Sequence, residues 1–309
     1  MAGISASKTR LAYVPETAWG VVPATPPFEK IRFTGESLAA DKQTVVSNEI
    51  REDRNVSDLI QVGRSGAGNI DAEFSYGTFD DWFSMMLCSE WGTDVLKNGV
   101  LEKSMLLEKT FMKSDGSPIM HRYGGTSINT MSLGITAQQL VTLGFGVMSK
   151  GVAQDIVPVT GATYADATTT SVLSASADFG SLVVTGLGAS PLIQGLTLEM
   201  TNNLRQQNVV GSMDSAGQGY GRFALTGTMN VYFEDEAIYD AFLDHTSVDL
   251  EFTLGTEAGS RYKFELPNIK LSGGNPTAGG NDQDVMMNMN WQALYDATSE
   301  ATITITRAV

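Results

Sequence analysis

The sequence predicts a mainly β fold, organised as two tandem β-sandwich or β-barrel domains with one flanking α-helix each. The composition is the first observation, with 32 Gly residues and only 18% charged residues, which is typical of strands joined by turns. Alternating apolar and polar residues in many short segments are the second. The third is a strand-to-helix unit that occurs twice. The 309 residues, 42% of them hydrophobic, supply a core for one large domain or two modest ones.

The first strand-to-helix unit lies within residues 65–91, SGAGNIDAEFSYGTFDDWFSMMLCSEW. Apolar residues alternate with polar ones from Ile70 onward, which predicts a half-buried strand with Ser75 on its wet face. Thr78 is the predicted helix N-cap, and Asp81 completes a weak capping box. The apolar side chains that follow recur at helical spacing and predict a stripe buried in the core. They are Phe79, Trp82, Phe83, Met86 and Leu87.

The second unit lies within residues 225–247, LTGTMNVYFEDEAIYDAFLDHTS. Apolar residues alternate with polar ones from Met229 to Phe233, and Asp235 is the predicted N-cap of a second helix. The apolar face of this helix is predicted to consist of Ile238, Ala241 and Phe242. The two units correspond without a gap at six positions: Gly68, Ile70, Ala72, Phe74, Phe79 and Phe83 match Gly227, Met229, Val231, Phe233, Ile238 and Phe242.

Each unit is embedded in the same order of predicted elements. A strand, near 30–35 or 193–200, precedes a long polar excursion, 37–66 or 201–221, which leads into the unit. Further strands follow each helix, at 104–112, 129–135 and 139–151 in the first half and at 248–255, 261–269, 284–296 and 301–309 in the second. Because a repeated order indicates internal duplication, the sequence predicts a first domain over residues 1–160 and a second over 161–309.

The side chains that usually carry chemistry are sparse. His121, in a segment predicted as a loop, and His245 lie in different halves, without a second ligand at metal-binding spacing. Cys88 has no disulfide partner, and its place beside the first apolar stripe predicts a small buried hydrophobe. The carboxylates that alternate on strand faces are typical of a solvated sheet. We therefore predict no catalytic, cofactor-binding or metal-binding residue, and a protein that is not an enzyme.

The charge balance bears on possible partners. The formal net charge is −15, which disfavours nucleic-acid binding because contact with phosphates needs clustered Lys and Arg. An acidic surface suits letting a polyanion pass without sticking, although acidity also simply keeps a protein soluble. The first 20 residues contain no apolar run of a secretory signal, and no window approaches the ~20 apolar residues of a membrane helix. We expect a cytoplasm-like compartment and no membrane.

The two long excursions are the candidate functional surface. Loops beyond ~12–15 residues are usually functional or disordered. Mixed charge on a projecting loop suits a polar contact that sets the register with another subunit, and the alternative is a solvated loop. The candidate contact residues are Glu49, Arg51, Asp53, Arg54, Arg64, Arg205 and Asp214.

Three stretches of the first half carry a family resemblance: the strand FTGESL, the loop NEIREDR and the helix start YGTFDD. Together with LPNIKLSGGNPTAGGNDQDVMMNMNWQALYD in the second half, they resemble the tail tube (major tail) proteins of long-tailed, non-contractile bacteriophages. That resemblance implies the lambda-like tube fold, two packed sheets with a helix at the flank, once in each half.

The resemblance also implies an assembly. Domains of such proteins join their inner sheets into a ring around a lumen, and rings stack through a long loop, here within 37–66 and 201–221. A duplicated chain implies trimers with pseudo-six-fold symmetry, whose acidic lumen conducts DNA without binding it specifically. The implied partners are the chain itself, a tape measure protein, and tail terminator and tail-tip or baseplate proteins. The implied location is the virion tail, after assembly in the host bacterial cytoplasm.

Three alternatives remain at this point. The nearest is another phage tail or baseplate structural protein. A carbohydrate-active enzyme on a β scaffold lacks a convincing acid pair in the sequence. A secreted β protein, such as a porin or an adhesin, lacks the expected signal sequence and would not need two amphipathic helices.

Overall fold

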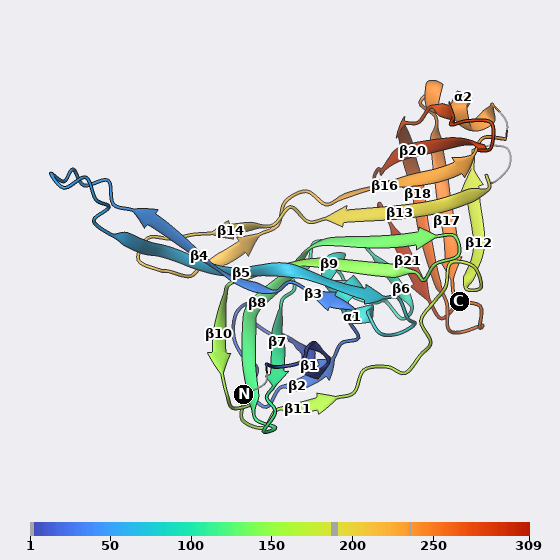
Figure 1. Ribbon diagram of the computed structural model, residues 1–309. Helices are drawn as coiled ribbons and strands as arrows, with labels where there is room; N and C mark the ends of the chain where they lie inside the picture. Colours follow the sequence, from blue (N-terminus) through green and yellow to red (C-terminus); the bar gives the residue numbers. More distant parts are fainter. Residues whose placement is uncertain (1–2, 187–190, 235) are drawn as a thin grey trace.

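The structure is a computed structural model that describes residues 3–186, 191–234 and 236–309 (Figure 1). It is mainly β, and one helix lies in each half of the chain, α1 (Asp80–Met86) and α2 (Ala237–Leu243), which confirms the predicted fold class. A 3₁₀ turn, Ala6–Lys8, precedes the first strand. Curled sheets form the body, and long β-ribbons project from one side of it (Figure 1).

The strands of the first half are β1 (Thr9–Pro15), β2 (Pro27–Lys30), β3 (Gly35–Glu36), β4 (Ala39–Val46), β5 (Leu59–Glu73), β6 (Val95–Lys97), β7 (Met105–Met112), β8 (Pro118–Thr136), β9 (Thr142–Ser149), β10 (Gly151–Asp155) and β11 (Thr163–Ala165). Those of the second half are β12 (Phe179–Thr185), β13 (Ile193–Thr201), β14 (Arg205–Gln207), β15 (Gly217–Gly219), β16 (Ala224–Tyr232), β17 (Ser247–Leu254), β18 (Tyr262–Gly273), β19 (Pro276–Ala278), β20 (Val285–Ala293) and β21 (Thr304–Arg307).

The strands pair in the same order in the two halves. In the first half the order is β1, β7, β8, β9, β5 and β4, with β10 also on β8. In the second half it is β12, β17, β18, β20, β16 and β13, with β21 also on β18. The boundary near residue 160 stays a prediction. It falls just before β11, which pairs in parallel with β2 of the first half.

Strands β8 and β13 join the two halves into one sheet. They pair antiparallel over seven residues each, from Gly195 opposite Thr136 to Thr201 opposite Thr130. One apolar core runs through both halves beneath this sheet. The alternation read from the sequence predicts its members: Phe74, directly after β5, and Met229, on β16, are both fully buried.

Helix α1 is buried as the sequence predicts, because every member of its apolar stripe is at most 1% exposed. The predicted capping is wrong: Phe79 occupies the N-cap and makes no side-chain cap bond. The Thr78 hydroxyl instead bonds the hydroxyl of Ser75, 2.6 Å away, and Ser75 is buried rather than wet. Asp81 accepts a hydrogen bond from the Tyr13 hydroxyl at 3.1 Å. The predicted N-cap of α2, Asp235, lies outside the described residues.

Four segments differ from their predictions, and one of them is the excursion 201–221, which contains the hairpin of β14 and β15. Residues 31–34 are not a strand, because β2 ends before them and β3 begins after them. The excursion 37–66 is mostly a long hairpin, in which only residues 47–58 connect β4 to β5. His121 lies on β8 rather than in a loop. The hairpin was missed because every residue of β4 is exposed, so its sequence lacks the alternation that burial imposes on a strand.

Candidate functional site: the projecting hairpins and the wet face of the sheet

Two hairpins project from the same side of the molecule (Figure 1). The first joins β4 to β5, and the second joins β14 to β15. They occupy equivalent positions, because the first connects β4 to β5 before α1, and the second lies in the connection from β13 to β16 before α2. Both arise from the polar excursions that the sequence singles out.

Large apolar side chains are exposed along both hairpins. Ile50 is 99% exposed at the tip of the first, and Val210 is fully exposed at the tip of the second. Further exposed members are Val45, Val46, Val56, Leu59, Ile60, Val62, Val209 and Met213. A two-stranded ribbon is only marginally stable alone, and clustered exposed apolar residues mark interaction surfaces. The hairpins therefore have the composition of a surface that another chain covers.

Arg64 and Asp214 tie the second hairpin to the first. The Arg64 Nε and Nη2 atoms donate to the two carboxylate oxygens of Asp214 at 2.5 and 2.9 Å, a bidentate pair. The Arg64 amide also donates to the Met213 carbonyl at 2.9 Å. The hydrogen bond from Arg64 lowers the pKa of Asp214. The structure thus brings together two of the predicted residues that the sequence separates widely.

Arg51 and Asp53 pair within the tip of the first hairpin. The guanidinium donates from Nε and Nη2 at 3.0 and 2.9 Å, and this bond lowers the pKa of the Asp53 carboxyl to about 2. Their contact shapes the tip locally. Glu49, Arg54 and Arg205 are exposed, and none of them forms an ion pair within the described ranges.

Two glutamines that the sequence analysis missed anchor the second hairpin to the end of β9. Gln218 donates from Nε2 to the Met148 carbonyl at 3.0 Å, and Gln206 donates to the Ser149 carbonyl at 3.5 Å. Their spacing carries no recognisable signal, because their partners are backbone carbonyls of a distant strand.

The face of the joined sheet opposite the core is the second candidate surface. Residues directly opposite one another across antiparallel strands share a face. One row across it reads Glu73, Thr142, Gly134, Thr197, Thr228 and Asn290. The next reads Asp71, Gly144, Ser132, Glu199, Thr226 and Gln292. This wet face is thus mostly hydroxyl, amide and glycine, and its charges in these rows are three carboxylates.

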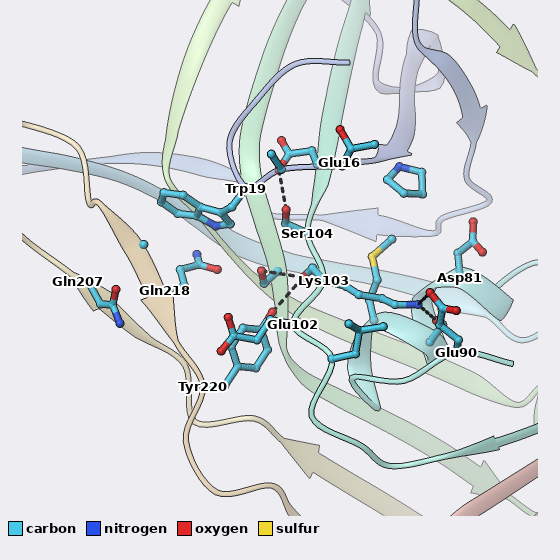
Figure 2. A pocket seen from close by; sticks show the side chains of 18 of the residues that line it. Glu16, Trp19, Asp81, Glu90, Glu102, Lys103, Ser104, Gln207, Gln218 and Tyr220 are labelled. Atoms are coloured by element: carbon cyan, nitrogen blue, oxygen red, sulfur yellow. Dashed lines mark hydrogen bonds and ion pairs between the residues drawn. The ribbon is translucent and has the colours of Figure 1, made fainter. Parts of the chain in front are cut away.

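A cavity of roughly 680 Å³ lies between the second hairpin and the first half of the chain (Figure 2). Gln218, Tyr220 and Glu16 line it, and the Tyr220 hydroxyl donates to the Lys103 carbonyl at 2.9 Å. The Glu16 carboxylate accepts hydrogen bonds from the Ser104 hydroxyl at 2.7 Å and from the amides of Gly20 and Gly125 at 2.8 and 2.9 Å. This carboxylate holds the surrounding loops, which is a structural task.

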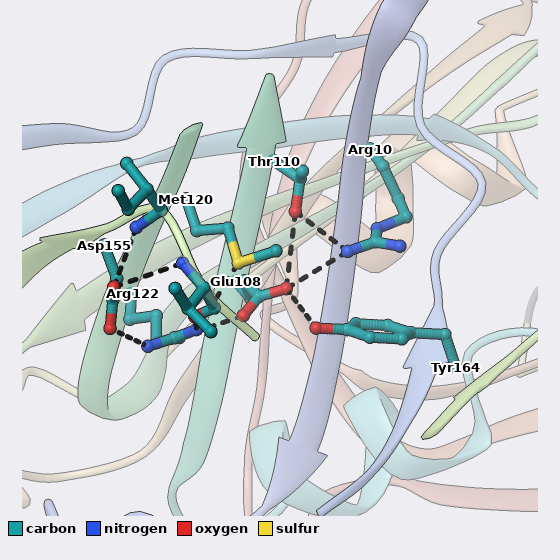
Figure 3. Close-up of polar contacts among 9 residues, drawn as sticks. Arg10, Glu108, Thr110, Met120, Arg122, Asp155 and Tyr164 are labelled. Atoms are coloured by element: carbon teal, nitrogen blue, oxygen red, sulfur yellow. Dashed lines mark hydrogen bonds and ion pairs between the residues drawn. The ribbon is translucent and has the colours of Figure 1, made fainter. Parts of the chain in front are cut away.

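The most deeply buried charge, Glu108, lies on β7 (Figure 3). Its carboxylate is 0% exposed and accepts hydrogen bonds from the Tyr164 hydroxyl at 2.7 Å, Arg122 Nε at 2.9 Å and Arg10 Nη2 at 3.2 Å. Arg122 reaches on to Asp155 at 2.8 Å. The network clamps β10 and β11 onto the first half of the sheet.

A family profile described as phage tail tube protein matches residues 6–293. The chain belongs to the phage tail tube protein family. It is therefore a structural component of a bacteriophage tail, as the resemblance implied. No match was found among curated proteins.

The tail tube protein has few of the side chains that usually carry chemistry, with two His and one Cys. Among the residues that the structure describes, no group of three His, Cys, Asp or Glu side chains is placed to hold a metal ion. Burial, and secondarily Glu102, raises the pKa of the Cys88 thiol to about 11, which disfavours the reactive thiolate. His121 packs edge-on against Phe111 in the sheet. No helix within the described ranges has the length and hydropathy to cross a membrane.

Proposed function

We propose that three copies of this tail tube protein close into a ring with pseudo-six-fold symmetry, and that such rings stack into the tube. One observation carries the proposal: the two halves repeat the same order of strand pairing and project equivalent hairpins from the same side of the molecule (Figure 1). A chain with two equivalent domains, 1–160 and 161–309, supplies two of the six positions in a ring. The closed ring removes the exposed sheet edges, which favours assembly over aggregation.

The hairpins are the proposed stacking surface. Six of them, two from each chain, would project from one face of a ring toward the next. The exposed apolar residues would supply buried area in that contact. The unpaired charges of Glu49, Arg54 and Arg205 would set its register.

The wet face of the joined sheet is the proposed lining of the lumen. Carboxylates of Asp71, Glu73 and Glu199 would make it acidic, and its many hydroxyl and amide groups would offer DNA no cluster of cations to bind. DNA would pass without specific binding during ejection from a long, non-contractile tail. The chain would have no catalytic task.

The remaining partners follow from the place of such a tube. A tape measure protein would occupy the lumen before DNA, and terminator and tail-tip or baseplate proteins would contact the end rings. Subunits would assemble in the cytoplasm of the host bacterium.

Negative-stain electron microscopy of the concentrated protein, combined with a mass measurement per ring, tests the proposal. Hollow tubes with six-fold end views and three chains per ring are expected. Tubes with six chains per ring would contradict the duplicated arrangement. A protein found in the tail tip or baseplate, and not along the tube, would overturn the tube assignment.

A further inference from the structure

We infer that neighbouring copies join through one strand pair with a defined register: residues 35–41 of one copy run antiparallel to residues 273–279 of the next. Residue 35 lies opposite 279, 39 opposite 275 and 41 opposite 273. This inference rests on the proposed ring and names the contact that closes it.

The junction inside the chain is the template. Strands β8 and β13 pair between the halves, with Gly195 opposite Thr136 and Thr201 opposite Thr130. If each half repeats the other, the start of the first half carries an edge equivalent to that of β13. The end of the second half then carries an edge equivalent to that of β8.

The start of the first half matches β13. Strand β3 places Gly35 opposite Asp71 on β5, and β13 places Gly195 opposite Asn230 on β16. The gapless match of Gly68 with Gly227 makes Asp71 and Asn230 equivalent, so residue 35 corresponds to 195. Counting onward from residues 35 and 195, residues 39 and 41 correspond to 199 and 201. The strand pairings agree, because Ala39 lies opposite Ala67, Glu199 lies opposite Thr226, and Ala67 and Thr226 are equivalent.

The end of the second half matches β8. Ile128 lies opposite Val147 and Leu271 lies opposite Trp291, and each strand then carries a bulge before its next pair. The bulges fall between Ile128 and Thr130 and between Leu271 and Gly273. Residue 130 therefore corresponds to 273, and the next residues follow without a gap.

Both edges are open in the single chain, except at Leu38, whose amide donates to the Glu36 carboxylate at 3.0 Å. Residues 35, 36 and 39–41 pair only with β5, and Gly273 and Pro276–Ala278 pair only with β20, within the described part of the chain. Ala39 and Asn275, which the register places face to face, are both exposed. Unpaired backbone groups at such edges are a template for another strand.

Pro276 tests the register, because proline donates no backbone hydrogen bond. It corresponds to Leu133 on β8. The Ala137 amide donates to the Gln194 carbonyl, and every second residue of a strand directs its amide toward the same neighbouring strand, so the Leu133 amide points toward β13. The register places Pro276 opposite Leu38. The carbonyl of Leu38 already accepts a hydrogen bond from the Tyr123 hydroxyl at 3.1 Å. Pro276 has no amide hydrogen to donate, and the register places it opposite the Leu38 carbonyl, which already has a hydrogen bond from Tyr123.

A disulfide between copies tests the register in assembled tubes. Ala39 and Asn275 correspond to Glu199 and Ser132, a pair between two hydrogen-bonded pairs, where the Cα atoms approach within disulfide range. The Ala39→Cys/Asn275→Cys variant should form covalent species that end at three chains on a non-reducing gel. The control is Ala40→Cys/Asn275→Cys, whose side chains would point to opposite faces. Native Cys88 is buried and does not compete.

We expect at least about tenfold more cross-linked chain in the first variant than in the control, because disulfide geometry is specific. Tubes that form without cross-links, or with more cross-links in the control, would overturn the register and leave the tube proposal standing. Absence of tubes and rings in wild-type protein and both variants would overturn the ring and this inference together. Cross-linked species ending at six chains would keep the strand pair but contradict the trimer.

Discussion

Replacing Glu108 with Gln should destabilise the first half of the tail tube protein. The substitution keeps the shape of the side chain and removes the charge that faces Arg10, Arg122 and Tyr164. Breaking a buried ion pair typically costs about 3–5 kcal/mol. Here the loss should be about 2–4 kcal/mol, because Arg122 keeps Asp155 at 2.8 Å and the Arg10 side chain is 28% exposed to water.

Thermal unfolding, followed by tryptophan fluorescence, measures this loss. For 309 residues a loss of 3 kcal/mol lowers the melting temperature by about 5 °C. The matched control is Asp166→Asn, which removes an exposed ion pair with Lys30 next to the pairing of β11 with β2 and should cost less than about 1 kcal/mol. Equal effects of the two substitutions, or none for Glu108→Gln, would refute the assignment of a stabilising buried clamp.

The same network predicts a pH dependence. Burial, and then the hydrogen bond to Glu108, raise the pKa of Tyr164 from 10.0 to about 12. The folded chain therefore keeps this proton where the unfolded chain loses it. The contribution of Tyr164 should be complete below pH 10 and should be lost as the pH rises through 12. Tyr164→Phe should remove that part of the alkaline dependence; an unchanged profile would contradict it.

Three further outcomes are expected. Gly227→Ala should destabilise the protein by about 3 kcal/mol in chemical denaturation, because its Cβ would clash with a backbone carbonyl and a tryptophan ring. Arg64→Ala should speed amide exchange in the second hairpin by up to about fivefold at neutral pH. Because Arg64 lowers the pKa of Asp214, the difference in exchange rate between wild type and variant should vanish as the pH falls below 3.8 and Asp214 takes up its proton. In assembled tubes Thr228→Cys should react with a small maleimide and resist a bulky polymer-linked one. Equal reaction with both reagents would contradict the placement of residue 228 in the lumen.

Local pattern was enough for both helices and for long strands with one face on the core, such as β5 and β16, whereas short strands such as β6, β14 and β19 were not predicted. Met229 to Phe233 alternates because one side of β16 faces the core, and the stripe of α1 recurs at helical spacing for the same reason. Where neither side of a strand is buried, as in β4, the pattern vanishes and the sequence read as a loop. Thr78 matched a capping signal but met a different partner, Ser75, once the strand before it had folded.

The candidate surface was predicted in part. The long excursions were identified from their length and mixed charge, and the structure places both on one side of the molecule (Figure 1). It joins Arg64 to Asp214, whereas Arg51 meets only its neighbour Asp53. The rows across the wet face of the joined sheet could not be predicted, because they combine residues from six strands of both halves.

By itself, the sequence determined the mainly β class, the two helices, the repeated unit and the family resemblance. Each of these depends on residues close together in the chain or on sequence motifs that a family profile can match. Only the tertiary structure decided which edges stay open, which residues line up across the wet face and which acid is buried. Glu108 sits among ordinary strand residues in the sequence, and its partners Arg10 and Arg122 come from two other strands. Such pairings depend on strand order and register, which contacts distant in the chain determine.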